Sequence, residues 1–213
     1  MEDEEKLEEI FNMFVKKVKS KIDLSNYSHD EWFEAALSTV NFGNLYRIIK
    51  SQGYSVAKWA RTYYFTFQKK VFRLLSDLET KIDSISDEMD RISENVHVPL
   101  GVVQKCVTII AKYIISAYYC FKNIDKIKEQ FQWVTNIDVI KKIPAPIDSK
   151  VLKSLDKLTI CDDASSKNTF RHSKIAWSRL NKANYNKIQN EIWRLSVQNK
   201  MFPIELEMKE LWK

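Results

Sequence analysis

The chain has 213 residues, of which 45% are hydrophobic and 12% aromatic, so it is long and apolar enough to fold around its own core. It contains only 3 Gly and 4 Pro. These are too few for the turns of a β-sandwich or barrel, and the glycines are too far apart to form a phosphate-binding loop. The composition therefore disfavours all-β folds, P-loop NTPases and Rossmann enzymes, and it predicts an all-α protein with a formal net charge of +6.

The first predicted helix carries apolar residues at spacings of three and four, which form one stripe. This stripe consists of Leu7, Ile10, Phe11, Phe14, Val15 and Val18. Acidic residues at the start of the helix and lysines at its end complement the helix dipole. Two interpretations stay open: an ordinary helix packed on its own core, or an extended arm over residues 1–27 that docks on another chain.

Capping and turn signals predict the elements that follow. In chain order they are a short helix capped by Ser28 and Glu31, a turn at 42–44, a helix over 45–51, a long helical stretch over 55–95 with a break near Ser76 or Ser84, and an apolar helix over 99–121. This apolar stretch contains two lysines, so we interpret it as a core helix and expect no transmembrane segment. The acidic start of the chain does not resemble a secretion signal.

Two prolines within residues 143–147 mark the candidate boundary between an N-lobe, residues 28–143, and a C-lobe, residues 144–213. Residues 158–168 are expected to form a loop, followed by helices near 169–181, 184–199 and 203–212. The three cysteines form no CxxC pair and no cluster with His, so we expect small buried thiols in a reducing compartment.

Basic residues gather in two stretches of the chain. Residues 47–76 contain seven Lys or Arg and no acid, and residues 164–204 contain eight against a single Glu. Aromatic residues lie among them, and single-stranded nucleic acid needs both cations for phosphates and flat rings for unstacked bases. Alternatively, the aromatics face the core, where Phe65, Phe72 and Trp177 have suitable spacings, and the basic face meets a membrane surface or an acidic protein.

Catalytic motifs are lacking. None of the three His lies in a metal-binding or triad motif, so we expect no enzyme, no metal and no cofactor. A two-metal nuclease built on Asp162 and Asp163 is the remaining catalytic alternative.

Several segments resemble a known family when they are taken in order. Glu31, Trp32, Ala36, Phe42, Arg47, Gly53 and Trp59 match its early pattern, and residues 98–103, 177–181, 196–204 and 209–212 match later segments. On these residues the chain resembles a divergent nucleoprotein of the phlebovirus–tenuivirus type, from segmented negative-strand RNA viruses. The family carries a Trp in its central helix, where this chain has Ile110 or Tyr113.

The resemblance implies an all-α, two-lobed core with an extended N-terminal helical arm. It further implies that single-stranded genomic RNA is held in a basic groove between the lobes, without sequence specificity. From the basic stretches and the resemblance together we expect these RNA-binding residues: Arg47, Lys50, Arg61, Tyr64, Lys69, Lys70, Arg73, Lys105, Lys112, Arg171, Lys174, Trp177 and Arg179. The apolar stripe of the first helix would then insert into the next protomer.

The partners implied by the resemblance are single-stranded RNA, further copies of the chain in a ring or filament, and a viral polymerase. The implied location is the host cytoplasm and the virion, and no small-molecule substrate is expected. The competing hypothesis from the residues alone is a helical scaffold or adaptor subunit that binds an acidic protein partner or a membrane surface.

Overall fold

A computed structural model describes residues 2–18, 22–40, 42–51, 53–121, 124–162, 175–177 and 180–211. Within these ranges the chain forms helices and no strand, which confirms the all-α prediction. The elements are α1 (Glu2–Val18), α2 (His29–Ser38), α3 (Phe42–Ser51), α4 (Val56–Ser76), α5 (Leu78–Lys81), η1 (Ile82–Ser84), α6 (Ile85–Val96), α7 (Leu100–Tyr119), α8 (Ile124–Gln130), η2 (Gln132–Thr135), α9 (Ile137–Lys142), α10 (Ser149–Asp162), α11 (Lys182–Gln198), α12 (Pro203–Leu206) and the π-helical turn η5 (Glu207–Leu211).

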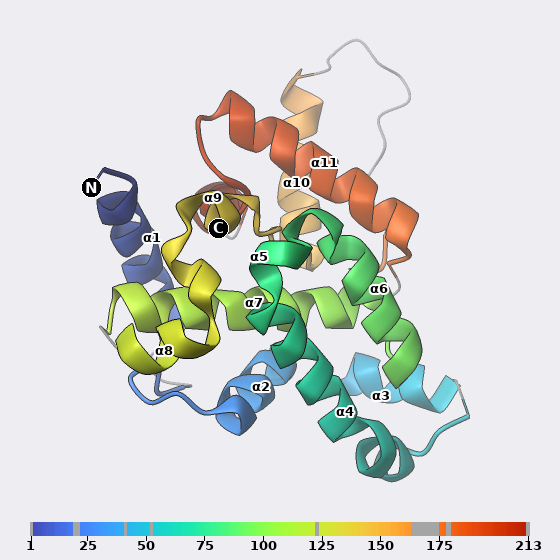
Figure 1. The fold of residues 1–213 in the computed structure, drawn as a ribbon. Helices are drawn as coiled ribbons and strands as arrows, with labels where there is room; N and C mark the ends of the chain where they lie inside the picture. Colours follow the sequence, from blue (N-terminus) through green and yellow to red (C-terminus); the bar gives the residue numbers. More distant parts are fainter. Residues whose placement is uncertain are drawn as a thin grey trace.

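Helix α7 is the centre of the fold, and α1, α2, α4, α6 and α8 all pack against it (Figure 1). Every residue from Leu100 to Ala117 is buried. The helix has 20 residues and is apolar enough to span a membrane, but 89% of its most apolar window is buried by the rest of the chain. It is therefore a core helix, as its two lysines predict.

Helix α1 packs on α7 of its own chain, which corresponds to the first of the two interpretations, an ordinary helix on its own core. Its stripe is buried without a second chain at Leu7, Ile10, Phe11, Phe14 and Val15. The Phe14 ring lies 5.8 Å from the Tyr113 ring of α7, and Lys6 Nζ lies 2.9 Å from a carboxylate oxygen of Glu205. The side chain of Val18 lies outside the described residues. The stripe thus completes the core of this chain.

Most helix boundaries follow the local signals. Ser28 Oγ accepts a hydrogen bond from the Glu31 amide at 3.3 Å, which confirms the cap of α2, and both predicted breaks, Ser76 and Ser84, end a helical segment. Two predictions are wrong. Helix α3 begins at Phe42, where we expected a turn. Helix α10 runs to Asp162 through the first part of the expected loop, because apolar residues keep their helical spacing there; residues 163–168 lie outside the described ranges.

The proline segment 143–147 is buried in the core and is not an exposed link. Gln104 of α7 clamps it: the side-chain amide donates to Ile147 O at 2.8 Å, and the Ile147 amide donates back to Gln104 Oε1 at 3.0 Å. From the other side, Gln189 Nε2 donates to Ala145 O at 2.7 Å. Buried apolar residues before and after this segment belong to one continuous cluster.

The clamp gives a testable prediction. Gln104→Leu should lower the free energy of unfolding by about 2–4 kcal/mol, because the buried amide and carbonyl of Ile147 both lose their partner. Gln189→Leu removes one partner and should lower it by about 1–2 kcal/mol. Urea denaturation measures both values. An unchanged stability of the Gln104 variant would contradict the clamp.

Candidate nucleic-acid interface

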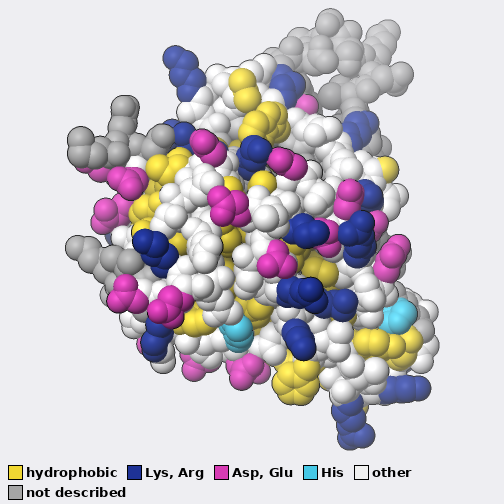
Figure 2. Space-filling model, viewed as in Figure 1, with side chains coloured by type: hydrophobic (Ala, Val, Ile, Leu, Met, Phe, Trp, Pro, Cys, Tyr) yellow, Lys and Arg dark blue, Asp and Glu magenta, His cyan; other side chains and the backbone are white. Residues whose placement is uncertain are grey.

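Helix α4 presents a long basic face to solvent. Ser55 Oγ caps the helix by accepting from the Lys58 amide at 3.1 Å, and the helix contains no acidic residue. Its outer side carries exposed residues at spacings of three and four: Lys58, Arg61, Thr62, Phe65, Lys69 and Arg73, which we call the basic face of α4. At 1.5 Å per residue the face is about 22 Å long. Figure 2 shows Lys and Arg side chains gathered over α4 and α6.

The inner side of α4 fixes this orientation. Trp59 is 3% exposed, and its Nε1 donates to Val96 O at the end of α6 at 2.7 Å. Phe67, Val71 and Leu75 are buried beyond it. Phe65, in contrast, is 72% exposed, although its spacing is compatible with the core. The basic face therefore carries one large apolar ring among its cations.

A hollow of about 280 Å³ lies beside this face, between α4 and α6. It is lined by Lys70, Arg73, Leu74, Asp77, Lys81, Glu88, Arg91, Ile92 and Asn95. Glu88 is shared by Lys81 Nζ at 3.2 Å and Arg91 Nη1 at 2.9 Å. Among the described residues, Lys70 and Arg73 form no ion pair, so the four cations outweigh the two carboxylates and the hollow attracts anions.

Sequence reasoning missed Lys81 and Arg91, because both lie in the acid-rich residues 77–94. Their contribution follows only from the packing of α5, which carries Lys81, and α6, which carries Arg91, on α4; both residues then line one hollow with Lys70 and Arg73. The spacing of Glu88 and Arg91 indicates a helical ion pair. It does not indicate which helix that pair faces.

Three other predicted residues of the first basic stretch are spread around α3 and α4. Arg47 and Lys50 are exposed on α3. Tyr64 faces inward and is half-buried: its ring lies 5.4 Å from the Phe33 ring, and it lines an apolar hollow of about 530 Å³ together with Trp59. Burial raises the pKa of Tyr64 to about 12. Tyr64 therefore does not belong to the basic face of α4.

The two lysines of α7 do not face RNA, so that prediction is wrong. Lys112 is 1% exposed and forms an ion pair with the buried Glu207 carboxylate. Lys105 is 8% exposed, and its Nζ donates to Thr39 O at 2.9 Å. The same Nζ lies 3.6 Å from Asp148 Oδ2. A buried charge needs such partners, and these lysines therefore hold the core together.

Of the RNA-binding residues predicted in the second basic stretch, the structure describes only Trp177. Trp177 is half-buried, with its ring centroid 5.0 Å from Lys105 Nζ, so it packs over a core lysine. Arg171, Lys174 and Arg179 lie outside the described residues. The expected groove between two lobes therefore rests on residues that the structure does not describe.

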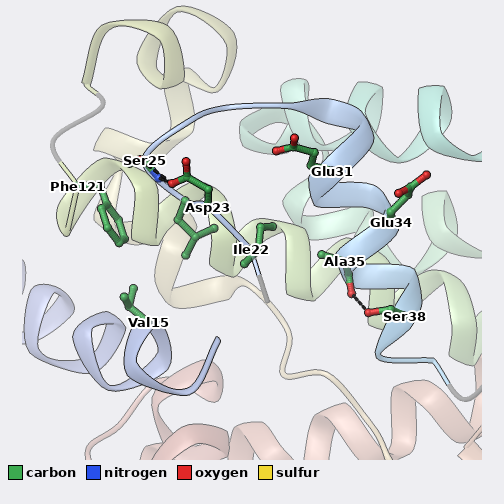
Figure 3. A pocket seen from close by; sticks show the side chains of 10 residues that line it. Val15, Ile22, Asp23, Ser25, Glu31, Glu34, Ala35, Ser38 and Phe121 are labelled. Carbon is green, nitrogen blue, oxygen red and sulfur yellow. Dashed lines mark hydrogen bonds between the residues drawn. The ribbon is translucent and has the colours of Figure 1, made fainter. Parts of the chain in front are cut away.

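A larger hollow, about 850 Å³, lies elsewhere, between the end of α1, residues 22–25, α2 and Phe121 (Figure 3). Its floor is apolar, and its rim carries the carboxylates of Asp23, Glu31 and Glu34. Hydrogen bonds from Ser25 to Asp23 lower the pKa of that carboxyl below its usual value. Three carboxylates repel phosphate groups, so this hollow is unsuited to nucleic acid.

No catalytic arrangement is evident among the described residues. They include no group of three or more His, Cys, Asp or Glu that would hold a metal ion. Burial raises the pKa of the Cys106 thiol to about 12, which keeps it protonated and unreactive. His29 Nε2 is hydrogen-bonded to Gln130 Nε2 at 2.9 Å, and no nucleophile takes part in that contact.

Comparisons with models of protein families, with curated proteins and with solved structures found no match to this chain. The class of this protein is therefore described by its fold and its surface. The described chain is an all-helical protein with a single buried core, and one helix without acidic residues displays cations and an exposed aromatic ring.

Proposed function

We propose that this protein binds single-stranded RNA on the basic face of α4 and in the adjoining hollow between α4 and α6. We further propose that it is a viral nucleoprotein, which coats genomic RNA without reading its sequence. The single observation that carries the RNA proposal is the combination on α4 of four exposed cations with Phe65, which is 72% exposed. The viral identity rests on the resemblance given above, and so do the host cytoplasm, the virion and the polymerase partner.

The chemistry of this face favours the sugar-phosphate backbone over the base edges. Lys and Arg neutralise phosphates, and an exposed ring stacks on any base. Asn and Gln side chains, which read adenine edges, are nearly absent from the face and the hollow. The one present, Asn95, already donates to Arg91 O at 2.6 Å. Binding should therefore tolerate any sequence.

Assembly into an oligomer through α1 is part of the proposal, in a modified form. Because α1 fills a site on its own chain, joining copies requires that α1 leave this site and enter the same site of a neighbour. Every copy carries the same helix and the same site, so such an exchange creates no new type of contact. Repetition of the exchange from copy to copy forms a ring or a filament.

Equilibrium binding at several salt concentrations tests the RNA proposal. If Lys58, Arg61, Lys69, Lys70 and Arg73 each contact one phosphate, log K should fall with log salt with a slope of about −3.5. Fluorescence anisotropy with labelled oligo-U and with a mixed-sequence RNA of equal length should give the same slope and similar affinities. Binding that ignores salt, or that demands one sequence, would contradict the proposal.

The adaptor hypothesis is the second candidate, and the docked α1 favours it, since a helix buried in its own core leaves the chain complete without further copies. An acidic protein partner would use the same cations but would not need Phe65. Competition between the labelled RNA and polyglutamate of equal charge separates the two candidates. Displacement by equimolar polyglutamate would favour the adaptor.

A further inference from the structure

We infer that three rings near the hollow between α4 and α6 form a stacking site for a single unpaired nucleobase. The rings belong to Tyr54, Tyr63 and His97. The centroids of Tyr54 and His97 lie 5.6 Å apart in a stacked arrangement, and those of Tyr63 and His97 lie 5.0 Å apart, edge to face. His97 is exposed and both tyrosines are half-buried, so the cluster is open to solvent. The inference rests on the proposed RNA-binding function.

The backbone of His97 has a conformation that is unusual for a residue with a side chain. His97 ends α6 in the left-handed conformation, with φ 54° and ψ 44°. Helices commonly end this way, but the residue at that place is usually Gly, since a side chain is disfavoured there. The backbone geometry alone therefore favours Gly over His. A strained residue that carries a ring at an open surface points to a use of that ring.

The end of α6 is held firmly, so the ring has a defined position. Trp59 Nε1 donates to Val96 O at 2.7 Å, which ties the last residue of α6 to α4. The Val98 amide donates to Ser93 O at 3.2 Å, and Ser93 Oγ donates to Val98 O. A site on a rigid element needs no ordering when a ligand binds.

The ring cluster continues the cationic hollow. Tyr63 and Lys70 are two helical turns apart on the side of α4 that faces α6, about 10 Å along the helix axis. On α6, Asn95 lines the hollow and stands two residues before His97. A base among the rings therefore has its phosphates close to cations.

The charge of the surroundings selects the ligand. Aromatic clusters also bind quaternary ammonium groups, but the cations along α4 repel a positively charged ligand. A nucleobase is neutral and brings anionic phosphates, which the same cations attract. The Tyr54 and Tyr63 hydroxyl oxygens lie 3.5 Å apart and offer hydrogen-bonding groups to the edge of a base.

The test uses His97→Gly in the full chain. This change removes one ring but suits the left-handed backbone, so stability in urea should be unchanged or higher. Affinity for a labelled 8-nucleotide oligo-A should fall about 5- to 30-fold, with the salt slope unchanged, because base stacking is lost and no phosphate contact is. An abasic oligonucleotide of equal length should bind the variant and the unaltered protein equally. His97→Asn, which also tolerates this backbone, should reproduce the loss.

Lys200→Gly is the matched control, since Lys200 lies two residues after the end of α11 and also has φ 54°. It should relieve the same backbone strain without changing the affinity for oligo-A. Equal affinity of His97→Gly and the unaltered protein for oligo-A would overturn the stacking site while leaving the proposed function intact. A loss that extends to the abasic strand would also overturn it. Absence of RNA binding by the unaltered protein would overturn the proposed function itself.

Discussion

Reversal of three charges on α4, with Lys69→Glu, Lys70→Glu and Arg73→Glu in one variant, should weaken single-stranded RNA binding at least ~100-fold at low salt. Three phosphate contacts are lost, and three carboxylates then repel the backbone. The dependence on salt should change as well. With only Lys58 and Arg61 left, the log–log slope should fall from about −3.5 to about −1.4. Fluorescence anisotropy with labelled oligo-U measures both quantities.

The variant should stay folded. Lys69 and Arg73 are exposed and Lys70 is half-buried, and none of the three forms an ion pair among the described residues. Glutamates near the C-terminal end of α4 interact unfavourably with the helix dipole, by about 0.3–1 kcal/mol each. This loss is small compared with the stability of a typical domain. Circular dichroism and urea denaturation check that the effect on RNA is not an effect on folding.

A matched control places the same change of net charge on another surface. Lys126 and Lys128 of α8 and Lys153 of α10 are exposed and form no ion pair among the described residues. Lys126→Glu, Lys128→Glu and Lys153→Glu in one variant should leave affinity within a few-fold and the slope unchanged. Equal losses in the two variants would mean that net charge attracts the RNA, and the basic face of α4 would lose its assigned role.

The parts of the fold that sequence predicts well are those that depend on local signals. Ser28 Oγ caps α2 by accepting a hydrogen bond from the Glu31 amide, and Ser76 and Ser84 end helical segments where expected. The basic face of α4 was also predictable. Helix α4 contains five Lys or Arg and no acidic residue, so a basic exposed side is expected for it.

What sequence could not provide is the neighbour of each side chain. Phe65 and Phe72 are seven residues apart and point in nearly the same direction from α4, yet one is exposed and the other is 4% exposed. The difference is His29, whose ring lies 3.9 Å from the Phe72 ring and covers it. The spacing within α4 does not reveal that the first residue of α2 packs on Phe72.

The same limit explains why the sequence leaves the partner of α1 open and assigns Lys112 to RNA. An amphipathic stripe looks the same whether its partner is its own chain or another. Lys6 and Glu205, and likewise Lys112 and Glu207, are far apart in the chain and lie together only in the fold. A lysine in an apolar helix thus indicates that it has a charged partner. For Lys112 the partner is the buried Glu207 carboxylate and not an RNA phosphate, which the charge pattern had suggested.

The buried pair of Lys112 and Glu207 leads to the second large effect. Lys112→Met should lower the free energy of unfolding by about 3–5 kcal/mol, because it removes the Lys112 counter-charge from the buried Glu207 carboxylate. Lys112→Met with Glu207→Leu removes both charges and should restore most of that stability. Lys209→Met breaks the pair of Lys209 with Glu205 at a half-buried site and should lower the free energy of unfolding by about 1 kcal/mol or less. Urea denaturation ranks the three variants; a double variant as unstable as the single one would contradict the buried-charge argument.

This pair also bears on the exchange of α1 between copies that we propose. Lys112 Nζ lies 5.3 Å from the centroid of the Phe14 ring, so α1 covers the ion pair. Release of α1 lets water reach both charges, and their hydration offsets part of the apolar surface that is exposed at the same time. The apolar double variant lacks this compensation and should therefore exchange α1 between copies more slowly. Mixing donor- and acceptor-labelled samples and following energy transfer measures the rate. Faster exchange in the double variant would show that the pair holds α1 in place and does not ease its release.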